Sequence, residues 1–425
     1  MSSGSATGPE IVTFGCRLNS VESEIIRRLA REAMLDDAVI VHTCAVTASA
    51  ERQARQAIRR AHRRRPGARI VVTGCAAQIA PERFAAMPEV STVLGNAEKL
   101  DPAAWRGVMT GSTEARVAVA DIMGARDTAW HLVDGFDAQT RAFVQAQQGC
   151  DHRCTFCIIP FGRGPSRSAP LGALVRQVRT LVATGYREVV LTGVDLTAYG
   201  ADLPGRPTLG AAIRRLLAAV PDLARLRLSS LDPAELDADF WRVFAEDERL
   251  MPHLHLSLQS GDDLILKRMK RRHTAAQGLA AALRARALRS EAAIGADVIA
   301  GFPTETETQS ANTIEMVEAA RIAYLHVFPF SPRPGTPAAR MPPVPGETVR
   351  ARAAALRAAG RQQREAHLRR QIGRRVEVLV ERDGRRGHAR DFAPIVLDRD
   401  AAPGSLIAAE VVGLDGDALR GRAVN

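Results

Sequence analysis

The sequence predicts an α/β protein with three parts: an open parallel sheet at the N-terminus, a partial barrel of six strand–helix units in the centre, and a small C-terminal β domain. Short apolar runs alternate with helical stretches over residues 11–105, and the alternation resumes at Arg141. After Gly373 the helical pattern stops, and strand-like runs follow that are separated by turns such as Asp383-Gly384. A chain of 425 residues, of which 46% are hydrophobic, can bury more than one core.

Three strands are expected in the N-terminal part, and they cover Ile11–Phe14, Ala38–His42 and Arg69–Thr73. The segment after the first strand carries apolar residues at helical spacing, namely Val21, Ile25, Ile26 and Leu29. A second helix, which is strongly basic, is expected from Ala50 to Arg65. This order of strands and helices is typical of an open parallel sheet.

Three of the six cysteines, Cys16, Cys44 and Cys75, each follow directly after one of these strands. The loops after the carboxyl ends of parallel strands gather along one edge of a sheet, where ligands bind. We therefore expect the three thiols to converge and to hold a metal–sulfur cluster, in addition to the one that the other three cysteines suggest below. The alternative is that each is an ordinary buried cysteine that only packs in the core.

Six strands are expected in the central part: Phe143–Gln147, Glu188–Thr192, Leu226–Ser229, His255–Leu258, Gly295–Ile299 and His326–Pro329. Helical stretches lie between them, for example Leu171–Thr184 and Thr308–Arg321. In a barrel of parallel strands the functional residues lie at the carboxyl ends of the strands. A basic helix over residues 344–370 then leads to the C-terminal strands Val376–Val380, Ile395–Leu397 and Ile407–Val412.

The chain has a formal net charge of +11, and nearly all of its basic residues are arginine. A basic surplus of this kind favours contact with nucleic-acid phosphates, although an Arg- and Ala-rich composition can also reflect the genome. We find no apolar run long enough to span a bilayer, and the Ser/Gly-rich start Met1–Glu10 lacks the pattern of a secretory signal. The expected compartment is the cytosol.

The other three cysteines, Cys150, Cys154 and Cys157, form a C-x3-C-x2-C pattern directly after the first central strand. Three thiolates at this spacing can bind three irons of a [4Fe–4S] cluster and leave the fourth iron open to another ligand. S-adenosylmethionine can chelate that open iron through its amino and carboxylate groups. Electron transfer from the cluster can then cleave its sulfonium bond to give a 5′-deoxyadenosyl radical.

Two other interpretations of this triplet remain open at this point. His152 or another residue could complete a zinc site, although zinc knuckles favour paired C-x2-C motifs on hairpins. A simple electron-transfer cluster would take a fourth thiolate, which is missing from this segment.

The triplet resembles the signature of the radical S-adenosylmethionine superfamily. Together with the segments around the first three cysteines, the sequence is similar to the methylthiotransferases; these segments are Thr13–Cys16, His42–Thr47 and Thr73–Gln78. Five further segments fit the same family, namely Leu191–Leu196, Leu228–Pro233, Ser257–Gly261, Asp297–Pro303 and Phe328–Arg333. The likeness covers nearly the whole chain and is weakest at the C-terminus.

The resemblance implies a domain order: a loose tail (1–10), an N-terminal methylthiotransferase domain (11–105), a linker (106–140), a radical S-adenosylmethionine core (141–370) and a small RNA-binding barrel of the TRAM type (371–425). It also implies two [4Fe–4S] clusters. Cys150, Cys154 and Cys157 would hold the radical-generating cluster, and Cys16, Cys44 and Cys75 an auxiliary cluster that takes part in sulfur insertion. The implied partners are the anticodon arm of tRNA and an external electron donor such as flavodoxin or ferredoxin.

The same segments suggest residues that contact S-adenosylmethionine, because small and polar side chains at strand ends let a ligand approach closely. The candidates are Gly193, Ser229, Ser257, Gln259 and Asp297. Ordinary turn chemistry is the alternative for each of them.

The implied activity is the addition of a methylthio group to carbon 2 of N6-threonylcarbamoyladenosine beside the anticodon. The stretch Cys44–Gln56 and the basic run Lys267–Thr274 resemble the enzymes with this substrate. Isopentenyladenosine in tRNA and a ribosomal protein are the substrates of sibling enzymes and remain alternatives, as does a zinc-stabilised RNA-binding protein without catalysis. The run could also be a solvated helix face. Two features depart from the family pattern: His42 replaces a common Asn, and a Tyr expected around Phe392 is missing.

Overall fold

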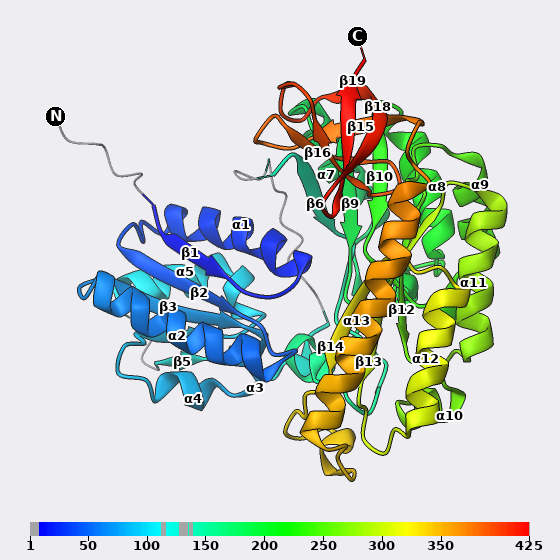
Figure 1. Cartoon of the computed structure of the whole chain (residues 1–425). Coiled ribbons are helices and arrows are strands. Elements are labelled where there is room, and N and C mark those ends of the chain that lie inside the picture. The colour runs from blue at the N-terminus through cyan, green and yellow to red at the C-terminus, as the bar shows by residue number, and fades with distance from the viewer. Residues whose placement is uncertain (1–7, 112–115, 127–134, 136–138, 425) are drawn as a thin grey trace. The chain divides into compact units, whose positions relative to one another are not determined.

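A computed structural model of the chain describes residues 8–111, 116–126, 135 and 139–424 (Figure 1). Most of the expected N-terminal tail lies outside these residues. The described chain divides into two compact units, one around the N-terminal sheet and one around the central and C-terminal barrels. The first unit also includes the segments 148–153 and 157–167.

The N-terminal unit is built on a five-stranded parallel sheet in the order β1-β2-β3-β4-β5. Its strands are β1 (Glu10–Thr13), β2 (Ala38–Thr43), β3 (Arg69–Gly74), β4 (Thr92–Leu94) and β5 (Val117–Ala118). The three strands that were expected from the sequence are neighbours in space. In register, Thr13 lies beside His42, and Thr43 lies beside Gly74. The carboxyl ends of β1, β2 and β3 therefore meet at one edge.

Helices cover both faces of this sheet (Figure 1). One face carries α1 (Arg17–Glu32) and α5 (Pro102–Thr110), and the other carries α2 (Ala48–Arg64), α3 (Cys75–Ile79) and α4 (Pro81–Ala85). The core under α2 is apolar because Ala54, Ile58 and Ala61 recur at helical spacing and pack on the buried valines of β2 and β3.

The segment expected to be a linker, residues 106–140, contains regular structure where it is described. It includes the end of α5, the strand β5 and a short 3-10 helix at Ile122–Gly124. β5 pairs with β4, so the N-terminal sheet continues past residue 105. A strand of two residues is too short to give a periodic sequence signal, which explains why the sequence did not reveal it.

The central part is a partial barrel of parallel strands, as the sequence predicted. One sheet has the order β10-β9-β6 and the next has the order β11-β12-β13-β14. The strands are β6 (Arg141–Gln145), β9 (Glu188–Thr192), β10 (Arg225–Leu228), β11 (Ser230–Leu231), β12 (His253–Gln259), β13 (Ala293–Ala300) and β14 (Tyr324–Pro329). Because β10 and β11 are parts of one strand interrupted at Ser229, the barrel has six strands.

Helices lie between consecutive strands of the barrel. They are α7 (Leu171–Ala183), α8 (Leu209–Ala219), α9 (Ala238–Glu246), α10 (Asp263–Arg268), α11 (Ala275–Leu288) and α12 (Glu307–Ala319). A short helix α6 (Ile159–Arg163) follows the central cysteines, and β7 (Gln147–Gln148) pairs with β8 (Arg167–Ser168). Side chains alternate along β12, where Leu254, Leu256 and Leu258 are fully buried. The opposite side of this strand presents polar residues.

The long helix α13 (Gly346–Arg369) connects the central barrel to a closed five-stranded barrel at the C-terminus (Figure 1). Its strands are β15 (Arg375–Val380), β16 (Arg386–Ala389), β17 (Pro394–Leu397), β18 (Leu406–Asp415) and β19 (Ala418–Ala423). A core of aliphatic residues fills this small barrel, including Val378, Ile395 and Leu419. The sequence did not reveal β16 and β19, because both are rich in Arg and Gly and lack an apolar alternation.

The C-terminal barrel contacts the central barrel through a group of six charged residues, here called the barrel-base charge group: Arg141, Glu188, Arg225, Arg227, Glu377 and Glu381. Arg141, Glu188 and Arg225 are the first residues of their strands, so the group lies at the amino ends of the barrel strands. Glu188 binds Arg227 at 2.8 Å. Burial would raise the pKa of Glu188, but the positive charge of Arg227 outweighs this effect and lowers that pKa to about 2. The carboxyl ends, which carry the candidate site residues, remain free of this contact.

Candidate functional site

The structure brings the first three cysteines together at the carboxyl edge of the N-terminal sheet. Cys16 directly precedes α1 and Cys75 begins α3, while Cys44 follows β2. All six cysteines lie in the described part of the chain, and none of them forms a disulfide. Three reduced thiols after adjacent strands are a donor set that fits an iron–sulfur cluster.

Glycines allow the cysteine loops to approach one another closely. Gly15 has φ +104°, and a Cβ there would lie only 3.0 Å from the Cys44 sulfur. A Cβ on Gly162, in α6, would meet the Cβ of Cys75 at 3.2 Å. The chain that follows Cys157 therefore packs directly against Cys75 within the same unit.

The Cys44 thiol is held in its protonated form in the absence of a cation. Burial, with a smaller contribution from the neighbouring Cys75 and Cys16, raises its pKa to about 11. Thiolates bind metals, so a bound cation would displace this proton.

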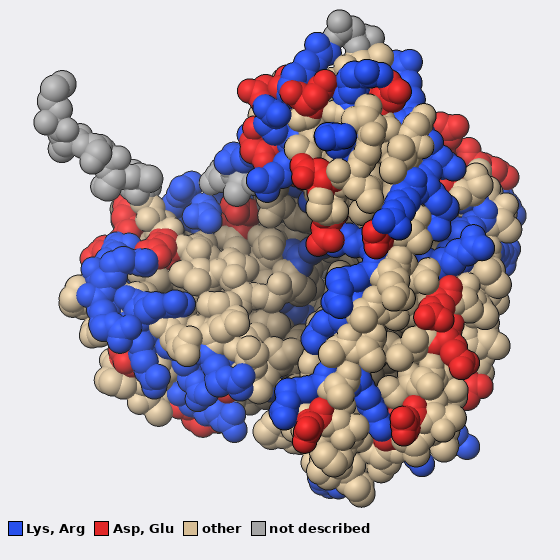
Figure 2. All heavy atoms as spheres, in the orientation of Figure 1, with Lys and Arg blue, Asp and Glu red and all other residues tan. Residues whose placement is uncertain are grey.

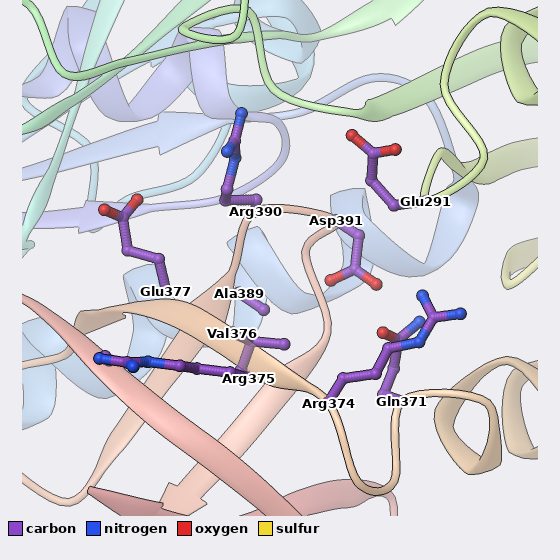
Figure 3. A pocket seen from close by; sticks show the side chains of 10 residues that line it. Glu291, Gln371, Arg374, Arg375, Val376, Glu377, Ala389, Arg390 and Asp391 are labelled. Atoms are coloured by element: carbon purple, nitrogen blue, oxygen red, sulfur yellow. The ribbon is translucent and has the colours of Figure 1, made fainter. Parts of the chain in front are cut away.

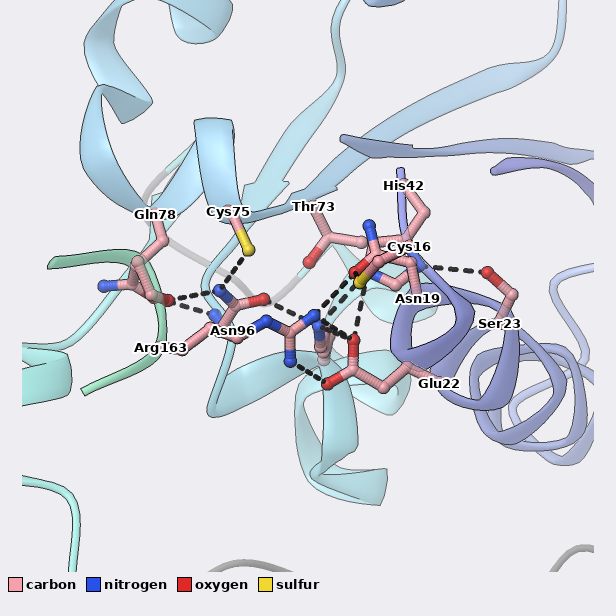
Figure 4. Close-up of polar contacts among 12 residues, drawn as sticks. Cys16, Asn19, Glu22, Ser23, His42, Thr73, Cys75, Gln78, Asn96 and Arg163 are labelled. Carbon is pink, nitrogen blue, oxygen red and sulfur yellow. Dashed lines mark hydrogen bonds and ion pairs between the residues drawn. The ribbon is translucent and has the colours of Figure 1, made fainter. Parts of the chain in front are cut away.

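Beside these cysteines lies a set of buried polar residues, here called the N-terminal charge group: Glu22, His42, Lys99 and Arg163. Figure 4 labels Glu22, His42 and Arg163. Glu22 and Lys99 have no exposed surface, and their Oε2 and Nζ atoms lie 2.7 Å apart. Arg163 donates to both carboxylate oxygens of Glu22, at 2.8 and 2.9 Å. Burial would raise the pKa of Glu22, but Arg163 and Lys99 outweigh it and hold that pKa well below its usual range.

Hydrogen bonds connect this group to the cysteines. Asn96 accepts from Lys99 at 2.6 Å through Oδ1, and its amide nitrogen lies 3.7 Å from the Cys75 sulfur. Asn19 accepts from Arg163 at 2.6 Å, and the Cys16 sulfur lies 3.8 Å from the same oxygen. Two asparagines therefore stand between the buried cations and two of the three sulfurs (Figure 4).

The central cysteines lie on the loop between β7 and α6, as the sequence predicted. Cys154 is buried, and its sulfur lies 3.7 Å from Nη1 of Arg271. Arg271 is held by Asp232 at 2.7 Å and by the carbonyl of Ser257 at 2.9 Å. A guanidinium at this distance stabilises a thiolate or an anionic cluster.

The candidate ligand-contacting residues all lie at or near the carboxyl ends of barrel strands. Gly193 follows β9, and its amide donates to the hydroxyl of Ser229 at 3.2 Å. Ser257 and Gln259 lie on β12, and Gln259 adopts φ +69°. These four residues are consistent with a ligand site but also with strand-end structure, so their role stays a prediction.

Asp297 forms a cluster with two histidines that the sequence analysis did not single out. Its Oδ1 lies 2.9 Å from Nε2 of His255 and 3.2 Å from Nδ1 of His326. Burial would raise the pKa of Asp297, but the two histidines lower it below its usual range. Asp297 is thus ionised and already has two partners.

Several of these residues escaped the sequence analysis. Lys99, Glu22 and Arg163 come from three distant segments, and Arg271 belongs to the basic run Lys267–Thr274, part of which is buried. A signal was available for Glu22, because it lies on the apolar face of α1 between Leu18 and Ile25.

Basic side chains and a cavity mark the remaining surface. Exposed arginines gather over the outer faces of α2 and α13 (Figure 2).

A cavity of about 390 Å³ lies where α13 enters the C-terminal barrel (Figure 3). Its charged lining residues are Glu291, Arg374, Arg375, Glu377, Arg390 and Asp391.

Comparison with known proteins now identifies the family. Residues 144–317 match the model of the radical SAM superfamily, and residues 9–95 match an uncharacterized protein family, UPF0004. The chain is 52% identical to the threonylcarbamoyladenosine tRNA methylthiotransferase MtaB of Rickettsia prowazekii, over 96% of this chain and 95% of that protein. The chain belongs to the radical S-adenosylmethionine methylthiotransferase family. Members of the radical S-adenosylmethionine superfamily use a [4Fe–4S] cluster and S-adenosylmethionine.

Two further relatives represent two kinds of tRNA methylthiotransferase, one each. The MtaB enzyme of Aquifex aeolicus is 34% identical, over 88% of this chain and 92% of that protein. The tRNA-2-methylthio-N(6)-dimethylallyladenosine synthase of Erythrobacter litoralis is also 34% identical, over 97% and 96%. The prediction of a methylthiotransferase from the six cysteines is confirmed.

A solved structure supports the fold of this methylthiotransferase. The radical S-adenosylmethionine methyltransferase TsrM of Kitasatospora setae superposes with a TM-score of 0.53 at 18% identity, covering 76% of this chain and 67% of that one. Among the described residues, no helix has the length and apolarity needed to cross a membrane.

Proposed function

We propose that this methylthiotransferase adds a methylthio group to carbon 2 of N6-threonylcarbamoyladenosine in tRNA, beside the anticodon. The observation that carries the proposal is the meeting of Cys16, Cys44 and Cys75 after three adjacent strands, in a chain of this family. The substrate is supported by the Rickettsia prowazekii relative, since its identity of 52% exceeds the 34% of the dimethylallyladenosine synthase.

Two [4Fe–4S] clusters would account for all six cysteines. Cys150, Cys154 and Cys157 would hold one, and Cys16, Cys44 and Cys75 would hold the other. When bound, the first cluster would supply the electron that cleaves S-adenosylmethionine, and the second would hold the sulfur to be inserted. An external reductant such as flavodoxin or ferredoxin would deliver that electron.

The protein's own residues orient and balance these groups. Arg271, held by Asp232, places a positive charge 3.7 Å from the Cys154 sulfur. Gly193, Ser229, Ser257, Gln259 and Asp297 would bind S-adenosylmethionine or the adenine, since they share the carboxyl end of the barrel with Cys154. The amide of Asn96 would orient Cys75.

The tRNA would contact basic surfaces. The arginine-covered faces of α2 and α13 suit phosphates, and the C-terminal barrel would act as a TRAM-type RNA-binding domain.

Nucleoside analysis tests the substrate. A deletion strain should lack the methylthio form of N6-threonylcarbamoyladenosine, and the intact gene should restore it, while Cys75→Ala and Cys154→Ala variants should not. The variant Leu283→Ala, at an exposed position of α11, serves as the control and should restore it fully. Loss of methylthio-isopentenyladenosine instead, or of a modified ribosomal protein, would reassign the substrate.

Metal analysis tests the two clusters. Anaerobic reconstitution should give about eight irons and eight sulfides per chain, and about four of each in Cys75→Ala. One or two zinc ions without sulfide would instead indicate a zinc-stabilised RNA-binding protein.

A further inference from the structure

The N-terminal charge group contains more positive than negative charge. Glu22 is ionised, since its pKa lies well below the usual range, and it is the group's one carboxylate. Arg163 is always charged. His42 is neutral, because its Nε2 faces the Lys99 ammonium at 3.2 Å and can only accept from it.

Burial lowers the pKa of Lys99, and the adjacent Glu22 carboxylate opposes that shift. The hydrogen bonds of Lys99 fit the charged ammonium form. Its Nζ has three partners at bonding distance: Glu22 Oε2 at 2.7 Å, Asn96 Oδ1 at 2.6 Å and His42 Nε2 at 3.2 Å. An ammonium has three N–H donors and no acceptor, so this arrangement satisfies all three donors. His42 can accept through Nε2 because its Nδ1 pairs with the Ser23 hydroxyl at 2.9 Å. Two cations and one carboxylate therefore leave one surplus positive charge in a fully buried place.

A buried charge without a counter-ion is costly, so the surplus requires an anion nearby. The cysteine sulfurs are the nearest candidates. Arg163 donates to the Asn19 Oδ1 atom at 2.6 Å, and the Cys16 sulfur lies 3.8 Å from the same oxygen. Asn96 connects Lys99 to the Cys75 sulfur, and Gly162, the residue before Arg163, packs on Cys75.

The proposed second cluster has a matching charge. Three thiolates on an oxidised cluster core with two positive charges leave one net negative charge. We propose that Lys99 and Arg163, offset by Glu22, form a fixed counter-charge that neutralises this cluster and raises its reduction potential. The inference rests on the proposed cluster at Cys16, Cys44 and Cys75. It follows because an electron added to a cluster is stabilised by a nearby fixed positive charge.

The experiment uses the full chain with Cys150, Cys154 and Cys157 replaced by alanine, so that the remaining signal comes from the N-terminal cysteines alone. Four forms are compared: this parent, Glu22→Gln, Lys99→Met, and the double variant. Glu22→Gln adds one positive charge to the site, Lys99→Met removes one, and the double variant restores the parental charge. The midpoint potential is measured by redox titration followed by electron paramagnetic resonance.

Lys99→Met should lower the reduced-to-oxidised ratio at a fixed potential by about tenfold, which equals a shift of about 59 mV for one electron. Glu22→Gln should raise the ratio by a similar factor, and the double variant should return it to within about threefold of the parent. Shifts of one sign in both single variants, or no shift in either, would overturn the charge assignment.

Two controls keep the outcomes apart. Lys99→Arg keeps the charge, so it should keep the parental potential; a shift as large as that of Lys99→Met would assign the effect to packing. A parent that binds no iron or sulfide would refute the second cluster itself. A parent that binds about four irons, with potentials that ignore the charge changes, would refute this inference alone.

Discussion

The two charge groups of this methylthiotransferase differ in how they are balanced. The barrel-base charge group contains three arginines and three glutamates, so its formal charges cancel. The N-terminal charge group contains two permanent cations and one carboxylate, so it carries a surplus. The first joins the central and C-terminal barrels, and the second borders the cysteines at the edge of the N-terminal sheet.

This difference separates structural from functional charge. A buried network with cancelling charges contributes through its internal hydrogen bonds, and no external ion is needed to complete it. A buried network with a surplus is complete only when an anion joins it. The comparison therefore predicts that damage to the barrel-base charge group acts on stability in every state of the protein, whereas damage to the N-terminal charge group depends on whether a cluster is bound.

The largest effect is expected for Glu188→Ala. Glu188 binds Arg227 at 2.8 Å and lies 3.6 Å from Arg225, and all three side chains are buried. Removal of the carboxylate leaves two arginines without their buried partner, which should cost about 3–5 kcal/mol of unfolding free energy. Denaturant titration, followed by hydrogen exchange in β9 and β10, measures the loss.

Glu377→Ala is the matched control in the same group. Its side chain is 48% exposed and also pairs with Arg225, at 2.9 Å. Because water reaches the half-exposed Glu377 carboxylate, its pair with Arg225 should contribute less than about 1 kcal/mol, and the unfolding free energy should stay near the parental value. Equal losses in both variants would mean that burial does not control the strength of these pairs.

The next effect is conditional on the cluster. Glu22→Gln should destabilise the iron-free N-terminal unit by about 3 kcal/mol, because Lys99 and Arg163 lose their one buried carboxylate. In the iron-loaded protein the anionic cluster supplies compensating charge, so we expect less than half of that loss. Thermal unfolding of both forms gives the difference. A loss of the same size in both forms would argue against the link between this group and the cysteines.

The sequence predicted much of the fold because the relevant signals are local. The strands β2, β3, β9, β12 and β13 are continuous apolar or alternating runs, and each was placed within two residues of its true ends. The strands β4, β5, β16 and β19 were missed, since they are either very short or rich in Arg and Gly. Their strand state depends on neighbours that are distant in sequence, such as the pairing of β17 with β19.

The candidate site was predictable only in part, for the same reason. The six cysteines stand at strand ends, so the rule for parallel sheets placed the first three at one edge. The charges around them are contributed by segments up to 141 residues apart, as in the pair Glu22–Arg163, and no local pattern connects these residues. His42, which departs from the family pattern, fits once its contacts with Lys99 and Ser23 are known.

Acid should affect the two groups in separate pH windows. The pKa of His42 is about 4 in the fold and about 6.5 when unfolded, so between these values the unfolded chain binds a proton that the fold does not. The unfolding free energy of the N-terminal unit should therefore fall by about 1 kcal/mol per pH unit as the pH falls from 6.5 to 4. Glu188 has a pKa of about 2 in the fold and about 4.5 when unfolded. Its contribution to the unfolding free energy should therefore stay constant down to about pH 4.5 and fall below that pH.

Hydrogen exchange of the iron-free protein, corrected for intrinsic rates, resolves these windows in β2 and β9. His42→Asn removes the titrating group and should flatten the loss in β2 between pH 6.5 and 4, while β9 stays unchanged. Simultaneous loss of protection in both strands would contradict separate windows.

The smallest effect is expected where the barrel-base charge group meets an aromatic ring. The guanidinium carbons of Arg227 and Arg141 lie 4.9 and 5.2 Å from the ring centre of Phe392. Phe392→Leu keeps an apolar side chain but removes both cation–π contacts, so we expect a loss of about 1 kcal/mol in denaturant titration. Phe392→Tyr keeps the ring face and should retain the parental stability. If the leucine variant were as stable as the tyrosine variant, the cation–π contacts would contribute nothing measurable to stability.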